Sequence, residues 1–193
     1  MSDPAWVRRF RAVEHDFPVW SPNDSETLGL VSNRDGSRQV WTFERSDGSW
    51  GRLSKEPIGV DLPAWAMPDG RFAWWSDKTG DERGELVTAT AGGAPEKVMP
   101  ELREGWPTGL AFAGERIAAT IEVDGAYTTY LVDPGRPPRV LWSTTFPSGV
   151  GRTYPMTGGL SADGSLLCVS HAEHGDILHL SLDANALPRS RHP

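Results

Sequence analysis

One pattern recurs four times along the 193-residue chain and restricts the possible fold more than any other feature. Its clearest copy spans 62–93, where short apolar or alternating stretches are separated by turn pairs such as Asp69-Gly70. Asp-Gly and Gly-Gly pairs supply the positive φ angles that tight hairpin turns require. The pattern therefore predicts a small antiparallel sheet with strands near 63–67, 71–76, 85–90 and 96–99.

The spacing of the copies indicates how these sheets are arranged. Each copy begins with a large apolar residue, and these residues lie 45, 45 and 50 positions apart: Trp20, Trp65, Leu110 and Leu160. Four-stranded units at such a period are typical of propeller blades, whereas helical repeats would show apolar spacing near 3.6. We predict an all-β partial β-propeller of about four consecutive antiparallel blades in an open arc. The blades are expected at about 17–57, 58–100, 106–145 and 157–184.

The two ends of the chain depart from the repeat. Asp3-Pro4 can begin a helix, so a short helical segment is expected over 1–16, with one apolar face formed by Trp6, Phe10, Val13 and Phe17. The Gly- and Pro-rich residues 146–157 are expected to be a long connection between blades. Residues 185–193 show no alternation and are expected to form an unstructured tail.

Composition bears on partners and compartment. The chain has 26 acidic and 19 basic residues and a net charge of −7, so nucleic acid and anionic membranes are not expected as partners. Neither a signal peptide nor a spanning helix is indicated at the N-terminus. A single cysteine cannot form an internal disulfide, which makes the cytoplasm the expected compartment. The nine tryptophans are expected to fill the wedges between blades, with Trp65 and Trp74 in structural roles.

Residues able to bind metal or react gather near the end of the chain. Four of them could in principle bind zinc, but their spacing matches no closed zinc site, so we interpret them as the polar tip of a hairpin: His171, His174, Asp176 and His179. Cys168 lies in an apolar run and is interpreted as a small buried hydrophobe. The acidic stretch 77–85 lacks the register of a calcium-binding EF-hand loop and is interpreted as a solvated loop. No metal site is predicted.

The motifs of common enzymes and cofactor sites do not appear. Gly149 and Gly151 lack the third glycine and the helix of a dinucleotide-binding loop. No G-x-S-x-G is present, so the nucleophile elbow of an α/β-hydrolase is not indicated. No catalytic residue, substrate-binding residue or cofactor is therefore predicted.

The sequences of the blades resemble the N-terminal propeller of the prolyl oligopeptidase family, especially that of bacterial acylaminoacyl and dipeptidyl peptidases. The resemblance extends from about Phe17 to His179 and is carried by three stretches, SNRDGSRQVWTFE, PDGRFAWWSDKTGDERGE and LSADGSLLCVSHAEHGDILH. A single Asp-Gly turn is shared with other propellers, such as the Tol-associated one. The resemblance implies a propeller that caps an α/β-hydrolase domain and limits access to small peptides. Nothing here matches that domain, so no catalytic residue of the family is carried over.

Two functions are consistent with these observations. The first, implied by the resemblance, is the non-catalytic propeller portion of a serine peptidase, inactive alone, which would gate peptide access to a hydrolase domain absent from this chain. The alternative is a stand-alone propeller that presents its loops to a protein partner.

Overall fold

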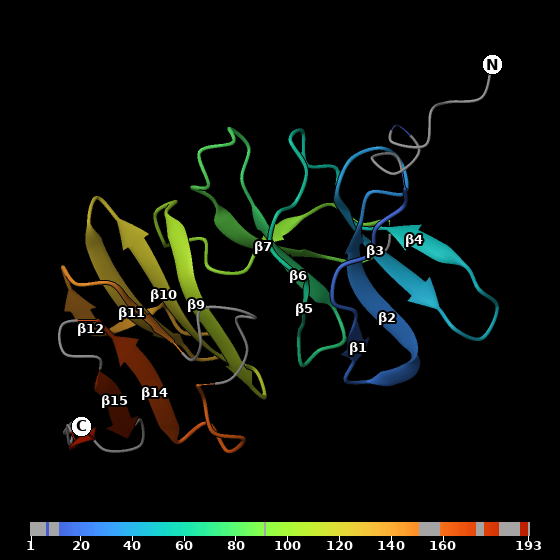
Figure 1. The fold of residues 1–193 in the computed structure, drawn as a ribbon. Coiled ribbons are helices and arrows are strands. Elements are labelled where there is room, and N and C mark those ends of the chain that lie inside the picture. Colours follow the sequence, from blue (N-terminus) through green and yellow to red (C-terminus); the bar gives the residue numbers. More distant parts are fainter. Residues whose placement is uncertain are drawn as a thin grey trace.

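The computed structural model describes Val7, 12–90, 92–150 and 159–172, together with the backbone of 176–181 and 190–192. Within these ranges the chain forms four antiparallel sheets of four strands each (Figure 1). The strands of every sheet lie in sequence order, as expected for a series of hairpins. No helix in this described part has the length and apolar character needed to cross a bilayer.

We call the sheets blades one to four. Blade one comprises β1 (Val19–Ser21), β2 (Asp24–Ser32), β3 (Gln39–Glu44) and β4 (Trp50–Arg52). Blade two comprises β5 (Trp65–Ala66), β6 (Phe72–Ser76), β7 (Glu85–Ala89) and β8 (Glu96–Lys97). Blade three comprises β9 (Trp106–Ala113), β10 (Arg116–Val123), β11 (Ala126–Val132) and β12 (Arg139–Thr144). Blade four comprises β13 (Ser148–Val150), β14 (Leu166–His171), β15 (Asp176–Ser181) and β16 (Ser190–His192).

The blades follow one another along an arc, with blade one and blade four at its two ends (Figure 1). First strands of neighbouring blades lie side by side, since β1 contacts β5 and β9 contacts β13. This arrangement is a partial β-propeller, and it confirms the predicted fold class.

The Asp-Gly pairs form the predicted turns. In the turn between β5 and β6, Gly70 has a φ of 88° and its N–H donates to the carbonyl of Met67 at 2.9 Å. The Asp69 carboxylate accepts the N–H of Arg71 at 3.0 Å, and this second hydrogen bond also stabilises the turn. A positive φ is easily adopted by glycine, so the local sequence specifies this turn.

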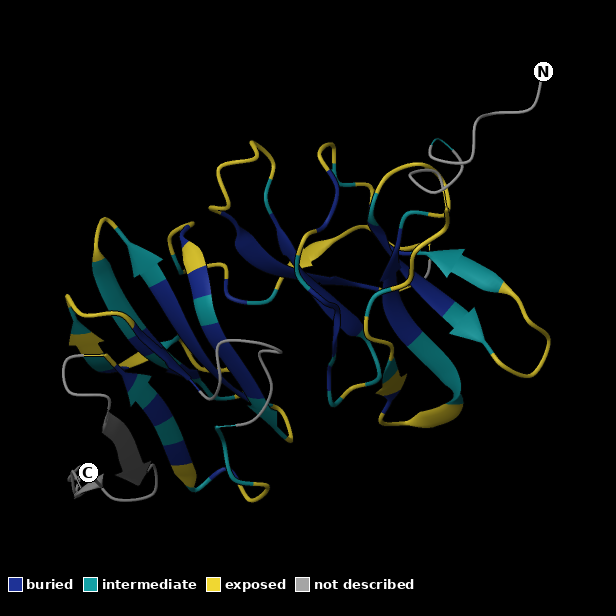
Figure 2. Cartoon of the chain, viewed as in Figure 1, coloured by how far each residue is buried: buried dark blue, intermediate teal, exposed yellow. Residues whose placement is uncertain are grey.

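Each pair of neighbouring blades encloses one apolar cluster. Blades one and two share a cluster that includes Val31, Val40 and Trp74, and blades two and three share one that includes Trp75 and Ile117. A third cluster joins blades three and four and consists of Ala111, Ala118, Leu131, Leu141, Val150, Leu167 and Val169. Blade two is covered on both faces, and every residue of β6 is buried (Figure 2). The successive tryptophans of β6 therefore serve two different interfaces.

Two expectations about blade four are wrong. Residues 148–150, expected to lie in a connection, form β13 and pair with β14, whereas Leu160 makes only an isolated bridge to Leu167. Residues 190–192, expected to lie in a tail, form β16 and pair with β15. The remaining tail residues, 185–189 and 193, lie outside the described residues. Both strands have only three residues, too few for alternation to predict them, and their pairing depends on strands distant in sequence.

The expected N-terminal helix is wrong for residues 12–16, and 1–6 and 8–11 lie outside the described residues. His15 bridges Ser32, and the N–H of Asp16 donates to the carbonyl of Val31 at 2.8 Å. These residues are extended because β2 continues beyond β1 and offers unpaired backbone groups at that end. Pairing with this edge overrides the helical spacing of the apolar residues.

Candidate functional site

A hollow of about 220 Å³ opens where the linker between blades one and two meets the loop between β6 and β7 and the start of β9. We call it the loop-face hollow. Its lining comes from three separate parts of the chain, and the residues used below are Ile58, Asp61, Leu62, Trp75, Glu82 and Trp106. Trp75 and Trp106 come from blades two and three, so the hollow exists only once these blades have packed together.

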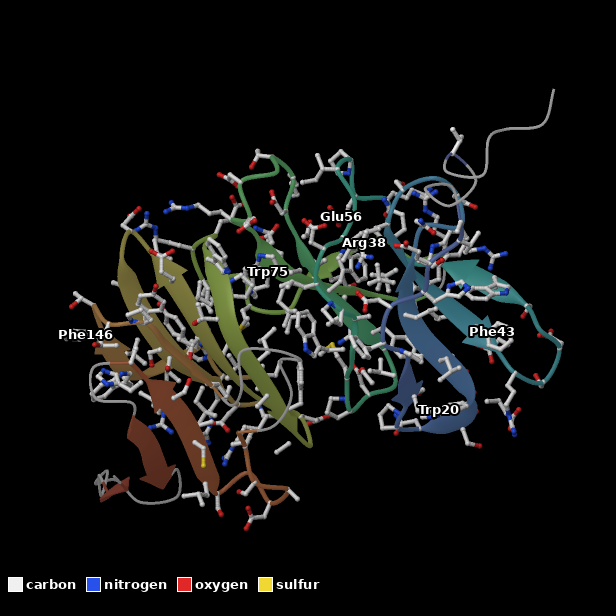
Figure 3. The ribbon with its side chains drawn as sticks, in the orientation of Figure 1. Trp20, Arg38, Phe43, Glu56, Trp75 and Phe146 are labelled. Carbon is white, nitrogen blue, oxygen red and sulfur yellow. The ribbon has the colours of Figure 1, made fainter. Side chains whose placement is uncertain are left out.

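Trp75 is the buried member of this lining. It lies between blades two and three (Figure 3) and is 5% exposed. Its indole Nε1 is buried and meets no hydrogen-bond acceptor among the described residues. Buried indole N–H groups usually have a partner, so this unsatisfied donor is an unusual feature of the packing beside the hollow.

Gly84 allows the loop beside Trp75 to approach closely. A Cβ atom at this position would lie 2.1 Å from the carbonyl oxygen of Ser76 and 2.9 Å from Trp75 Nε1. The backbone of Gly84 exchanges two hydrogen bonds with Gly105, at 2.9 and 3.1 Å, in the linker that leads to β9. The loop of blade two is thereby fastened to blade three at the edge of the hollow.

The loop that carries Glu82 is organised around Asp77. The Asp77 carboxylate accepts the backbone N–H groups of Thr79, Gly80 and Glu82 at 2.9, 2.8 and 2.6 Å. Burial raises the pKa of Asp77, but these N–H groups outweigh it and hold the pKa below its ordinary value. Asp77 is thus a charged anchor of its own loop, and its oxygens are occupied.

Glu82 adopts an unusual backbone conformation, with a φ of 64°. Non-glycine residues seldom occupy this left-handed region, and such outliers cluster at binding sites because the surrounding structure has to maintain them. Here Asp77 maintains it through the hydrogen bond from the Glu82 N–H. The carboxylate of Glu82 forms no ion pair or hydrogen bond with any described residue.

The mouth of the hollow is apolar and acidic. Ile58 and Trp106 are large apolar side chains that are 50% and 48% exposed. The carboxylate of Asp61, like that of Glu82, has no partner in the described ranges. Among the described residues, no lysine or arginine lines the hollow. The result is an apolar opening with two uncompensated negative charges beside it.

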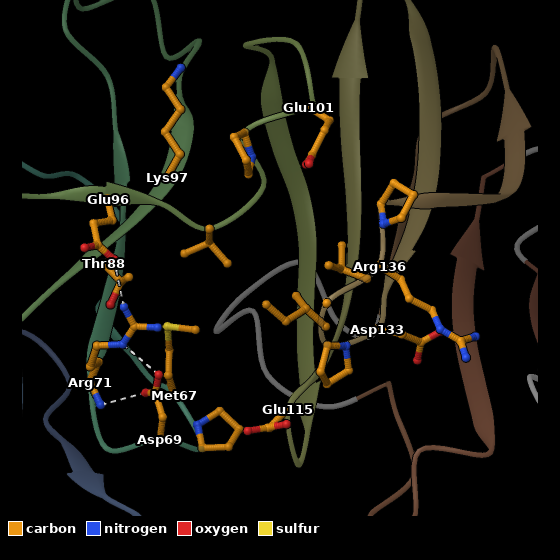
Figure 4. Close-up of a pocket in the computed structure, with 18 residues that line it drawn as sticks. Met67, Asp69, Arg71, Thr88, Glu96, Lys97, Glu101, Glu115, Asp133 and Arg136 are labelled. Carbon is orange, nitrogen blue, oxygen red and sulfur yellow. Dashed lines mark hydrogen bonds and ion pairs between the residues drawn. The ribbon is translucent and has the colours of Figure 1, made fainter.

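A larger groove of about 540 Å³ lies between blades two and three, around the turn of β5 and β6 and the loop after β11 (Figure 4). Many of its charges neutralise one another. Arg71 pairs with Asp69 at 2.6 Å and with Glu96 at 3.3 Å, as the dashed lines of Figure 4 show. Its Lys97 pairs with Glu85. These ion pairs connect strands and turns of blade two, so the charged groups have structural partners. We therefore interpret the groove as the open end of the interface between blades two and three.

The structure tests the residues singled out in the sequence only in part. His171 is buried, with its ring 5.6 Å from that of Trp142 and its Nε2 3.4 Å from the hydroxyl of Thr144. His174 and the side chains of Asp176 and His179 lie outside the described residues. Among the groups that are described, no cluster of three could hold a metal ion.

The remaining expectations concern burial. Cys168 was expected to be buried but is only half-buried, because its side of β14 faces away from blade three. The acidic stretch 77–85, predicted to be a solvated loop, is exposed over 78–83, whereas Asp77 is half-buried and Gly84 and Glu85 are buried. Trp65 and Trp74 are buried in the clusters between blades, which confirms their structural roles.

The lining of the loop-face hollow was not found from the sequence. Ile58 and Asp61 lie in a linker, and Trp106 lies at the start of a blade, so none belongs to the recurring turn pattern. The available signal was weak, because Ile58 and Trp106 are only two of several apolar residues in the connections 54–62 and 100–106.

Comparison with known proteins identifies the fold. Neither a family model nor a curated protein matches the chain. TolB from Acinetobacter baumannii superposes with a TM-score of 0.63 at 17% identity, covering 91% of this chain and 42% of TolB. An auxiliary nutrient binding protein from Bacteroides thetaiotaomicron superposes with a TM-score of 0.58 at 9% identity. The match covers 91% of this chain and 40% of that protein. This chain thus spans less than half the length of either protein, and at these identities the likeness shows the fold alone.

These matches correct the resemblance drawn from the sequence. The propeller is similar to those of TolB and a nutrient-binding protein, so its assignment to the prolyl oligopeptidase family was wrong, and the peptidase and hydrolase functions that it implied are not supported. The physical reason lies in the stretches that carried the resemblance. Asp-Gly turns and the large apolar residues before them specify a hairpin and a packing position, both of which any four-stranded blade requires.

Proposed function

We propose that this chain is a non-catalytic β-propeller module that binds a segment of a protein partner in the loop-face hollow. The observation that carries the proposal is the pair of exposed side chains, Ile58 and Trp106, that line a concave site. Large apolar side chains around a concave site mark interaction surfaces, and a few fixed polar groups give such sites their orientation.

The size of the hollow favours a side chain over a larger ligand. Its volume of about 220 Å³ is below the range of roughly 300–1,000 Å³ found for pockets that enclose whole small molecules. One or two side chains of a bound segment would fill it. As part of the proposal we retain the cytoplasm as compartment, on the basis of the single cysteine.

The proposal can be tested by panning a random peptide display library on the immobilised protein. Recovered clones are compared on the wild type and on an Ile58→Ser/Trp106→Ser double variant. The matched control is Val140→Ser, because Val140 is equally exposed but lies on β12 outside the hollow.

We expect clones that bind the wild type and the control but not the double variant. Both changed positions are half exposed, so the double variant should keep the thermal midpoint of the wild type. Failure to enrich any peptide, or clones that bind the double variant equally well, would refute the proposal.

A further inference from the structure

We propose that the loop-face hollow selects a positively charged side chain, lysine or arginine, that stands next to an apolar residue in the bound segment. This inference rests on the proposed function and specifies its ligand. It follows from the charge and the apolar surface of the hollow, each of which restricts the ligand in a different way.

The charge of the hollow is negative and uncompensated. Asp61 and Glu82 both line it, and neither carboxylate has a partner among the described residues. Several basic side chains nearby are engaged elsewhere. Arg38 reaches the backbone carbonyl of Asp61 at 3.5 Å, but its guanidinium pairs with Asp16. Arg83 and Arg103 both pair with Asp124, at 3.5 and 3.4 Å. A cation that enters the hollow therefore meets two free carboxylates, whereas an anion meets repulsion.

The apolar side chains define what kind of cation fits. Trp106 is half exposed, and the face of an indole ring attracts an ammonium or guanidinium group placed within about 6 Å of its centre. Lysine and arginine also carry aliphatic stems that pack on apolar surface while the charged head stays near water. Ile58 supplies such a surface on the opposite element, and it would also contact an apolar neighbour in the segment.

The apolar surface of the hollow argues against a simple ion. Ile58 and Trp106 are half exposed, and a bare cation has no apolar group to place against them. A peptide provides both a cationic side chain for the carboxylates and an apolar neighbour for Ile58 and Trp106. The combination therefore favours a basic and apolar peptide segment over a metal ion or a small amine.

The net charge of −7 would attract any basic peptide weakly. The test must therefore distinguish binding in the hollow from this non-specific electrostatic attraction. The probe is a peptide recovered from the display library by its dependence on Ile58 and Trp106, synthesised with a fluorescent label. Its basic residue is replaced by glutamine in one version and by glutamate in another. Binding is measured by fluorescence polarisation at low and at high salt.

We expect the selected peptides to be enriched in lysine or arginine at one position next to an apolar residue. Replacement of that residue by glutamine should weaken binding about tenfold, and glutamate should abolish it. On the protein side, Asp61→Asn and Glu82→Gln should each weaken binding of the basic peptide and reduce the salt dependence of that binding. Neither substitution should change the affinity for the glutamine version of the peptide. Glu115→Gln is the control, because Glu115 is an exposed carboxylate that lines the groove of Figure 4.

The outcomes distinguish this inference from the function on which it rests. The charge selectivity is refuted if peptides bind in the hollow equally well with glutamine in place of the basic residue, or if Glu115→Gln lowers their affinity as much as Glu82→Gln does. In either case the proposed function as a binding module is retained. If no peptide depends on Ile58 and Trp106, the proposed function fails and this inference fails with it.

Discussion

Residues of one type take opposite roles in this protein. Trp74 is fully buried between blades one and two, and its indole N–H donates to the Glu56 carboxylate at 2.8 Å. The same carboxylate accepts the hydroxyl of Ser76 at 2.9 Å, so Glu56 fastens the linker after blade one to β6 (Figure 3). Trp106, by contrast, leaves half of its surface in solvent. The environment decides which tryptophan stabilises the fold and which one is available to a partner.

Replacing Trp74 by alanine should destabilise the protein by about 3–5 kcal/mol, because the change leaves a cavity between two blades and removes the donor to Glu56. Chemical denaturation followed by circular dichroism measures this loss. Trp106→Ala is the matched control and should shift the midpoint little, since the side chain is half exposed. Equal effects of the two substitutions would mean that Trp74 does not occupy the interface.

Asp163 should titrate well below an ordinary aspartate. Its carboxylate accepts the Ser161 hydroxyl at 2.6 Å and the N–H and hydroxyl of Ser165 at 3.0 and 2.9 Å. These bonds, that of Ser161 first, lower the pKa of Asp163 from 3.8 to about 2. Because the folded state favours the charged form, the contribution of this turn to stability is complete above 3.8 and is lost as the pH falls toward 2.

The measurement is an NMR titration of the Asp163 carboxyl carbon. Ser161→Ala should move the midpoint of the titration back toward the ordinary value, whereas removal of a distant hydroxyl, as in Ser143→Ala, should leave it in place. A wild-type midpoint near 3.8 would show that the turn does not stabilise the charged carboxylate.

The backbones of β9 and β13 approach each other closely. A Cβ atom at Gly109 would lie 2.3 Å from the carbonyl oxygen of Val150, and one at Gly149 would lie 2.3 Å from that of Thr108. The hydroxyl of Thr108 also donates to the carbonyl of Ser148 at 2.7 Å. The two glycines therefore allow the first strands of blades three and four to meet backbone to backbone.

Gly109→Ala should separate these strands, because the opposing atoms belong to the backbone and cannot move aside as a side chain could. We expect a loss of about 1–3 kcal/mol, concentrated in blade four. Hydrogen exchange should show faster exchange of the β14 amides, with those of β2 and β6 unchanged. Ser143→Ala, at the far edge of blade three, serves as the control. Uniform exchange across all blades would contradict the predicted localisation.

At the scale of the whole molecule, blade one presents an apolar face that no described blade covers. Leu28 and Leu30 stand four and two residues before Ser32, in the places that Phe72 and Trp74 take before Ser76. In blade two those places pack against blade one. The corresponding face of blade one borders a hollow of about 390 Å³ lined by Leu28, Leu30, Phe43, Trp50 and residues 15–18. Trp20 and Phe43 are visible on this blade in Figure 3.

The purified chain should therefore bind a dye that reports apolar surface and should associate as its concentration rises. Size-exclusion chromatography with light scattering measures the association. Phe43→Ser should reduce both effects, whereas Val140→Ser, on an edge strand away from this face, should change them little. A compact monomer that binds no dye and unfolds in one step would contradict the prediction and favour a self-sufficient four-bladed module.

The sequence by itself determined the features that depend on neighbouring residues. Turn pairs such as Asp69-Gly70 and alternating runs such as Arg116 to Val123 specify hairpins locally, and their period of about 45 residues indicated blades. The same local character explains the misassigned family. A hairpin pattern is common to propellers of different function, so it predicted the architecture but not the relatives.

Only the tertiary structure decided the features that require distant segments to meet. The three-residue strands β13 and β16 exist because β14 and β15 offer them backbone partners, and 12–16 is extended because β2 does the same. The loop-face hollow combines Ile58, Trp75 and Trp106 from two blades and a linker. No spacing along the chain links these three residues, because their proximity results from the packing of one sheet on the next.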